Sequence, residues 1–150
     1  MISRLLSFKP LELADRETLR PAFRAYSPET SEWTFTNFFI WRGYYHFEWA
    51  HYEGLIVFLC RPEGGEPFLL MPIGQAPRPE KARLLLRALG DEPGVRHPAI
   101  HKADARFASL GRIARDRQPG LHKCPIRLDP DGIQQFRLDR KEAPRCVEHP

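Results

Sequence analysis

The sequence predicts an α/β (α+β) fold, in which helices flank a mainly antiparallel sheet. Residues 31–42 carry five aromatic side chains, and Phe35, Phe38 and Phe39 recur at the i, i+3, i+4 spacing of one helix face. Beyond this helix the apolar period changes to two, the period of a strand with one buried face. The run 55–60 is apolar throughout, as expected for a central strand covered on both sides.

The chain opens with a predicted strand around residues 8–11. Pro10 lacks an amide hydrogen, so it is expected in an edge strand or at the end of a strand. Asp15 is predicted to cap a helix that runs to Tyr26. Pro21 lies deep in that helix and is expected to kink or restart it, because proline removes a helical hydrogen bond.

The aromatic helix over residues 31–42 is predicted to begin at Thr30 or Ser31, either of which offers a side-chain oxygen as a cap. Glu32 follows in the first turn, where a negative charge interacts favourably with the helix dipole. Gly43 is expected to end the helix.

Three strands are predicted after this helix, and together they form an antiparallel meander. Their predicted ranges are 45–50, 55–60 and 67–73, separated by turns at 52–54 and 61–66.

Residues 79–89 are predicted to form the next helix, with Pro79 in its first turn and Gly90 as its stop. Three leucines are expected to face the core: Leu85, Leu86 and Leu89. The patterns weaken past residue 91, where the candidates are a helix over 104–117 and short strands over 126–128 and 136–138.

Composition divides the chain unevenly. All but two of the 17 aromatic residues precede residue 76, and the second half carries the excess of positive charge. We therefore expect an N-terminal half-domain over residues 1–95 and a divergent basic tail, rich in Pro and Arg, over 96–150. The composition of the tail is typical of a truncated gene or of a shifted reading frame. The alternative is a natural ending that has diverged from the family. The tail could bind an anionic partner such as RNA or a lipid headgroup, or simply form a solvated face.

Several classes of site and segment are not predicted. The three cysteines have no metal-binding spacing, which favours reduced thiols in a cytoplasmic protein. His97 and His101 stand four residues apart, but Pro98 between them argues against a shared helix face, so no metal site is predicted. No apolar window is long enough for a transmembrane helix.

The first part of the chain contains four short motifs in this order: Phe8-Lys9-Pro10, Asp15, residues 26–42 (YSPETSEWTFTNFFIWR) and residues 67–74 (PFLLMPIG). Together they resemble a family of bacterial proteins related to the C-terminal domain of phosphatidylglycerol lysyltransferase. The resemblance covers roughly residues 5–90 and fades beyond about residue 95.

This resemblance implies a GNAT-like (N-acetyltransferase-like) fold, normally present as a tandem pair of which this chain corresponds to the first. It also implies acyl or aminoacyl transfer, in the lysyltransferase from a charged tRNA to a phospholipid headgroup. In that family the second fold is the better candidate for the chemistry, so we expect no independent catalysis here. The usual Gln/Arg-x-x-Gly-x-Gly/Ala cofactor loop has its nearest counterpart at residues 61–66, which fails at Glu66, and no cofactor is predicted.

The polar and aromatic residues of the family-like helix are the candidate substrate-binding residues: Glu32, Asn37, Trp41 and Arg42. Arg42 could grip an anionic group while Trp41 forms a wall. In the alternative interpretation Arg42 pairs with a carboxylate and the aromatic residues fill the core. Glu32 is a weak candidate for a general base, because an acid in the first turn commonly just stabilises its helix.

Two functions are therefore carried forward. The first is an acyltransferase-like domain, a partial copy without its own catalysis, whose family partners are an acyl donor or aminoacyl-tRNA. The second is a non-enzymatic binding or scaffold module that contacts a partner, RNA or an anionic lipid headgroup through the aromatic helix or the basic tail. Loss of the second fold should also leave an exposed apolar face that favours self-association.

Overall fold

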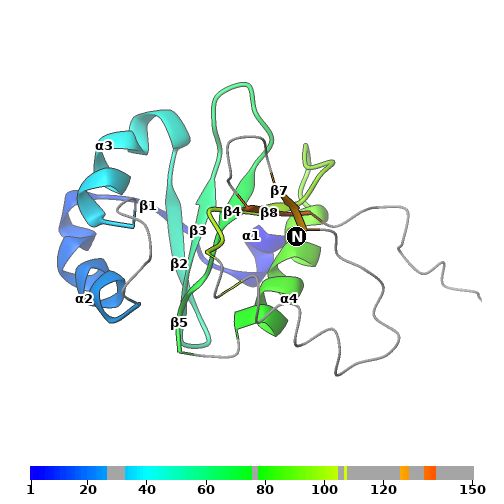
Figure 1. The fold of residues 1–150 in the computed structure, drawn as a ribbon. Helices are drawn as coiled ribbons and strands as arrows, with labels where there is room; N and C mark the ends of the chain where they lie inside the picture. The colour runs from blue at the N-terminus through cyan, green and yellow to red at the C-terminus, as the bar shows by residue number, and fades with distance from the viewer. Residues whose placement is uncertain (27–32, 76–77, 105–106, 108–125, 129–133, 138–150) are drawn as a thin grey trace, which may run out of the picture.

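The structure is a computed structural model that describes residues 1–26, 33–75, 78–104, 107, 126–128 and 134–137. The helical elements are α1 (Ile2–Leu5), the 3₁₀ turn η1 (Leu13–Asp15), α2 (Arg16–Tyr26), α3 (Phe35–Tyr45) and α4 (Arg78–Gly90). The strands are β1 (Lys9–Pro10), β2 (Glu48–Tyr52), β3 (Leu55–Cys60), β4 (Phe68–Leu70), β5 (Ile73–Gly74), β6 (Ala99–His101), β7 (Ile126–Leu128) and β8 (Gln134–Arg137). Figure 1 shows α2 and α3 on one side of the sheet and α1 and α4 on the other. The sheet is open, mixed and mostly antiparallel, which confirms the predicted α/β (α+β) class.

The strands follow the order β1-β2-β3-β4-β6-β8-β7, and β5 also pairs with β3. The β4–β6 pair is parallel, and α4 lies between these two strands in sequence. A crossover of this kind is needed because a tight hairpin cannot join parallel strands. Three strands come from beyond residue 95, so the sheet continues past the predicted end of the half-domain, and the division itself stays a prediction.

The predicted meander of β2, β3 and β4 is confirmed, with both strand pairs antiparallel. The range predicted for its first strand, 45–50, is wrong, because Tyr45 belongs to α3 and β2 runs from Glu48 to Tyr52. β1 occupies the edge position expected from Pro10. Glu53 and Gly54 form the tight turn between β2 and β3, with φ of 46° and 80°. Two consecutive positive φ values suit a two-residue hairpin, because their twist matches that of the flanking strands. All residues of β3 are buried, as expected for a central strand.

The strand predicted over residues 67–73 is divided into β4 and β5. Leu69 lies opposite Leu59, and Ile73 lies opposite Ile56, so the register shifts by one residue between the two strands. An extra residue of this kind is a β-bulge, and Pro72 within it has no amide hydrogen to donate.

Three described elements, α1, η1 and β6, were not predicted. At four residues α1 is too short to show a helical period, and a distant side chain completes its first turn. Ser3 donates both its backbone N–H and its Oγ–H to Glu92 Oε1, at 2.6 and 2.7 Å. Near the other end of the chain, β7 confirms the strand predicted over 126–128, and β8 overlaps the one predicted over 136–138. Most of the predicted helix 104–117 lies outside the described residues.

The predicted boundaries of the aromatic helix are wrong at both ends. α3 begins at Phe35, and Thr34 is its cap, accepting a hydrogen bond from the backbone N–H of Asn37 at 3.3 Å. The helix continues through Gly43 to Tyr45, and His46, which follows it, adopts the left-handed conformation. Glycine inside a helix costs about 1 kcal/mol. That cost is offset in the next turn, where the Tyr45 ring packs on neighbouring aromatic rings, including Phe47 at 5.3 Å between centroids.

The predicted start of α2 is also corrected. Asp15 ends η1, and its carboxylate accepts the backbone N–H of Glu12 at 2.9 Å, so it closes the 3₁₀ turn. α2 then runs without interruption through Pro21, where a kink or restart was expected. Leu19 and Phe23 are buried on either side of the proline, and this packing offsets the lost hydrogen bond.

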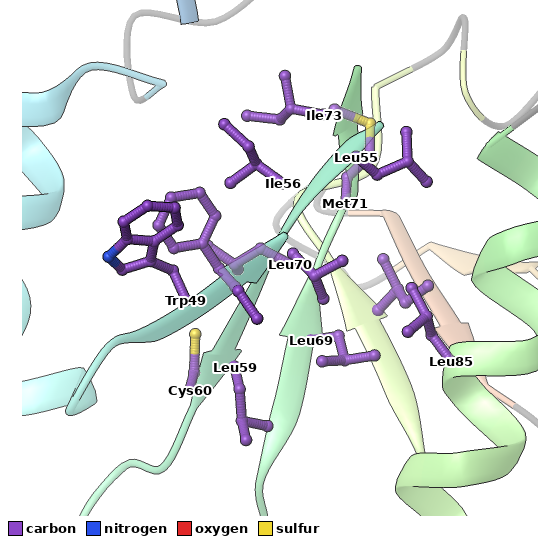
Figure 2. Close-up of a cluster of buried hydrophobic side chains, with 14 of the residues drawn as sticks. Trp49, Leu55, Ile56, Leu59, Cys60, Leu69, Leu70, Met71, Ile73 and Leu85 are labelled. Atoms are coloured by element: carbon purple, nitrogen blue, oxygen red, sulfur yellow. The ribbon is translucent and has the colours of Figure 1, made fainter. Parts of the chain in front are cut away.

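The core fills both faces of the sheet. Toward α2 and α3, Phe58 lies 5.9 Å from Phe23 and 4.7 Å from Phe38 between ring centroids. Figure 2 shows the side chains of β3 and β4 between Trp49 of β2 and Leu85 of α4. The leucines of α4 that were predicted to face the core are buried: Leu85, Leu86 and Leu89.

Glu66 fixes the segment before β6 to the β3–β4 connection. Its carboxylate accepts the backbone N–H of His97 at 2.9 Å and that of Arg96 at 3.0 Å. These two hydrogen bonds lower the pKa of Glu66 to about 2, although desolvation opposes the shift. The lowered pKa means that the contribution of Glu66 to stability is present above the ordinary pKa of 4.5 and is lost as the pH falls through about 2.

We therefore expect the Glu66 carboxyl to titrate near pH 2 in an NMR pH titration. In the Glu66→Ala variant, the amides of Arg96 and His97 should exchange with solvent markedly faster at neutral pH, because they lose their acceptor. Glu63, an exposed acid in the same connection, provides the matched control as Glu63→Ala. A midpoint near the ordinary value for Glu66, or equal exchange in both variants, would contradict this role.

Candidate functional site

The surface of α3 that points away from the core carries large apolar side chains. Asn37, Ile40, Trp41 and Tyr44 follow the i, i+3, i+4, i+7 spacing and therefore share one face of the helix. The side chains of Ile40, Trp41 and Tyr44 are 64%, 55% and 60% exposed. We call these four residues the outer face of α3. The opposite face of the same helix buries Phe35 and Phe38, so α3 is apolar nearly all round.

The structure separates the predicted site residues. Asn37 and Trp41 lie on the outer face, one helical turn apart. Arg42 lies off that face, where its guanidinium stacks 3.6 Å from the ring centroid of Phe39 and donates to the Phe39 carbonyl oxygen. Glu32 falls outside the described residues. Trp41 and Arg42 therefore do not form a joint binding site within α3. The assignment of these residues to substrate binding stays a prediction.

The alternative interpretation, that the aromatic residues fill the core, holds for part of the helix. Trp33 and Phe38 are buried and pack against each other at 5.4 Å between centroids, whereas Trp41 is exposed. Among the described residues Arg42 forms no ion pair with a carboxylate. The side chain of Arg42 is held instead by the ring beneath it, which is a cation–π contact.

A second group of polar side chains comes from the end of α2, the start of α4 and the segment after β6. The Tyr26 hydroxyl donates to the Asp104 carboxylate, and Asp104 also accepts the backbone N–H of Phe107 at 2.7 Å. Arg78, the first residue of α4, places its guanidinium 4.9 Å from the centroid of the Tyr26 ring. Burial raises the pKa of Tyr26, and the hydrogen bond to Asp104 adds to the shift, so Tyr26 stays a neutral donor.

This second group ties the end of α2 to the segment after β6. Arg78 Nη1 is buried and has no hydrogen-bond partner in the part of the chain that the structure describes. Chemically, that N–H could donate to a carboxylate or phosphate oxygen. Sequence reasoning missed the group because its members come from three distant segments.

The remaining reactive residues offer little chemistry. Cys60 is fully buried in β3, and burial raises the pKa of its thiol well above the ordinary value, which leaves it unreactive. His101 lies in β6 and stacks on Phe68 at 4.1 Å between centroids. Over the described ranges, no three His, Cys, Asp or Glu residues come together in a way that could hold a metal ion.

Comparison with known proteins gives a likeness of fold. No protein-family model matches the chain, and no curated protein matches it. A conserved protein of unknown function from Bacteroides thetaiotaomicron has a similar crystal structure, with a TM-score of 0.64 and 22% sequence identity. The match covers 74% of this chain but only 37% of that protein, which is therefore considerably longer than the matched region. In the described residues, no helix is long and apolar enough to cross a membrane. At this level of identity the likeness establishes a shared fold and nothing about activity.

Proposed function

We propose that this chain is a non-catalytic binding unit of an acyltransferase-like protein, and that it docks on a lipid membrane surface through the outer face of α3. The observation that carries the proposal is the exposure of Ile40, Trp41 and Tyr44 on one face of a helix whose other face is already in the core. An exposed apolar face of this kind marks an interaction site more often than an accident of packing.

The chemistry of the outer face favours a lipid surface as the partner. Tryptophan and tyrosine combine an apolar ring with a polar group, and they concentrate at the boundary between lipid headgroups and acyl chains. Ile40 adds aliphatic area, which stacking on nucleic-acid bases would not use. Arg42 is the only charged residue of α3, so docking this helix strips water from few charged groups.

Two further observations support the acyltransferase-like part of the proposal. The four sequence motifs resemble a family that acts on a phospholipid headgroup, so a membrane-facing surface suits the first unit of such a protein. The similar bacterial protein is also much longer than the region it shares with this chain, which is consistent with a two-unit arrangement. We place the transfer chemistry in the second unit of such a tandem pair, outside the present sequence, and the present chain contributes binding.

Vesicle binding tests the proposal. The wild-type chain should co-sediment with phospholipid vesicles, and Trp41→Ser/Tyr44→Ser should bind at least about tenfold more weakly, because two rings no longer enter the lipid boundary. Leu84 is a matched control, since it is 49% exposed on α4, on the opposite side of the sheet. The Leu84→Ser variant should bind like the wild type.

Three outcomes would overturn the proposal. One is an absence of vesicle binding by the wild-type chain. Another is a dimer in analytical ultracentrifugation that Trp41→Ser/Tyr44→Ser dissociates, because the outer face would then be a contact between two copies. The third is turnover of an acyl donor by the purified chain alone, which would show independent catalysis.

A further inference from the structure

A row of arginines runs along α2, the helix that lies with α3 on the same side of the sheet (Figure 1). Arg16, Arg20 and Arg24 are spaced i, i+4, i+8, so their side chains are neighbours along one flank of the helix. All three are exposed. We call them the arginine row.

In the described part of the chain, the positive charge of the arginine row exceeds the negative charge of α2. Glu17 is the only carboxylate in α2, and within the described part of the chain none of the three guanidinium groups forms an ion pair. Like charges four residues apart on a helix repel each other and destabilise it. The row therefore gains most from an external partner that supplies several negative charges at once.

We propose that the arginine row binds the phosphate groups of anionic phospholipids and gives the docking surface its preference for anionic membranes. This inference rests on the proposed membrane function. A guanidinium group presents parallel N–H donors that match phosphate oxygens, so each arginine can hold a headgroup by charge-assisted hydrogen bonds. Neighbouring guanidinium groups along the helix would meet neighbouring headgroups.

The two surfaces divide the work of docking. The apolar side chains on the outer face of α3 insert at the lipid boundary, and any phospholipid surface can accept them. The arginine row supplies electrostatic attraction, which only an anionic surface satisfies and which salt weakens. Figure 1 shows α2 and α3 on the same side of the sheet, and docking through both surfaces requires that one membrane meets the two helices together.

The test compares binding to vesicles of phosphatidylcholine alone with binding to vesicles that contain phosphatidylglycerol. The wild-type chain should prefer the anionic vesicles, and each arginine of the row should contribute about fivefold to that preference. Arg20→Gln/Arg24→Gln should lose most of the preference and most of the salt dependence. Its binding to phosphatidylcholine should be unchanged.

A matched double variant controls for net charge. Arg4 and Arg87 are exposed on α1 and α4, on the opposite side of the sheet, so Arg4→Gln/Arg87→Gln removes the same charge from another surface. This control should keep the wild-type preference. Equal losses in the two double variants would overturn the inference, because net charge alone would then explain binding. So would tighter, row-dependent binding to single-stranded RNA than to the anionic vesicles.

The outcomes also separate this inference from the proposed function. Equal binding of the wild type to both kinds of vesicle would refute a role for the row while leaving membrane docking by α3 intact. Binding to neither kind would refute both. All the substituted arginines are exposed, so the variants are expected to have the unfolding temperature of the wild type. This measurement is the control that a change in vesicle binding does not come from unfolding.

Discussion

Replacing Phe58 with alanine is expected to lower the free energy of unfolding by about 3–5 kcal/mol, the usual cost of removing a buried ring. Phe58 is completely buried at the centre of β3, and its ring contacts Phe23 of α2 and Phe38 of α3. The substitution leaves a cavity between the sheet and the helices α2 and α3. A protein of this size has only about 5–15 kcal/mol of stability, so the loss is a large share of the total.

Urea unfolding followed by tryptophan fluorescence measures this effect, because Trp33 and Trp49 are buried in the same core. Phe58→Leu keeps most of the volume and should cost less than about 1.5 kcal/mol. Tyr44→Ala removes an exposed ring from the outer face and should change stability by no more than about 0.5 kcal/mol. A cost below about 1 kcal/mol for Phe58→Ala would mean that α2 and α3 are not held by this ring.

Replacing Asp15 with asparagine is the second large effect, with an expected cost of about 1–3 kcal/mol. Asp15 is only 4% exposed, and its carboxylate accepts hydrogen bonds from the Trp49 indole, the Glu12 backbone N–H and Lys9. The amide oxygen of asparagine can still accept from the Trp49 indole and the Glu12 backbone N–H, which share Oδ2 of Asp15, but it accepts without a negative charge, and the amide NH₂ group then faces Lys9. The change also removes the ion pair with Lys9.

The pH dependence of this effect identifies the carboxylate as its source. Burial raises the pKa of Asp15, but the hydrogen bonds from Lys9, Glu12 and Trp49 outweigh burial, and the net pKa is lowered. The stability that Asp15 contributes is thus present above its ordinary pKa of 3.8 and is lost as the pH falls through its folded value. The difference in unfolding free energy between wild type and Asp15→Asn should therefore be constant near neutral pH and shrink in acid. A difference that grows in acid would contradict this assignment.

Asp15 also matters for the proposed function, because it anchors η1, which leads directly into α2. Its carboxylate joins η1 to Trp49 of β2, and Arg16, the first residue of the arginine row, follows directly. Loss of this anchor should loosen the start of α2 and reduce the preference for anionic vesicles in parallel with stability. Phe58 likewise anchors the helices, because its ring packs against Phe23 of α2 and Phe38 of α3.

The sequence determined the elements whose signal is local. The alternating and fully apolar runs predicted β2 and β3, and the hairpin between them followed from Glu53-Gly54. The leucines of α4 were predicted to be buried because helical spacing alone decides which residues share a face. Two of the residues predicted to bind substrate, Asn37 and Trp41, lie on the face of α3 that the structure leaves exposed.

The tertiary structure decided what depends on distant partners. α1 is completed by Glu92, Asp15 turns toward Trp49 and away from the start of α2, and Tyr45 extends α3 past Gly43 by packing on Phe47. The i, i+3, i+4 pattern of Phe35, Phe38 and Phe39 showed one buried face, but the sequence could not show that Ile40, Trp41 and Tyr44 would remain uncovered. Exposure is a property of the neighbours that a residue lacks, and those neighbours are fixed only when α2, α3 and the sheet are packed together.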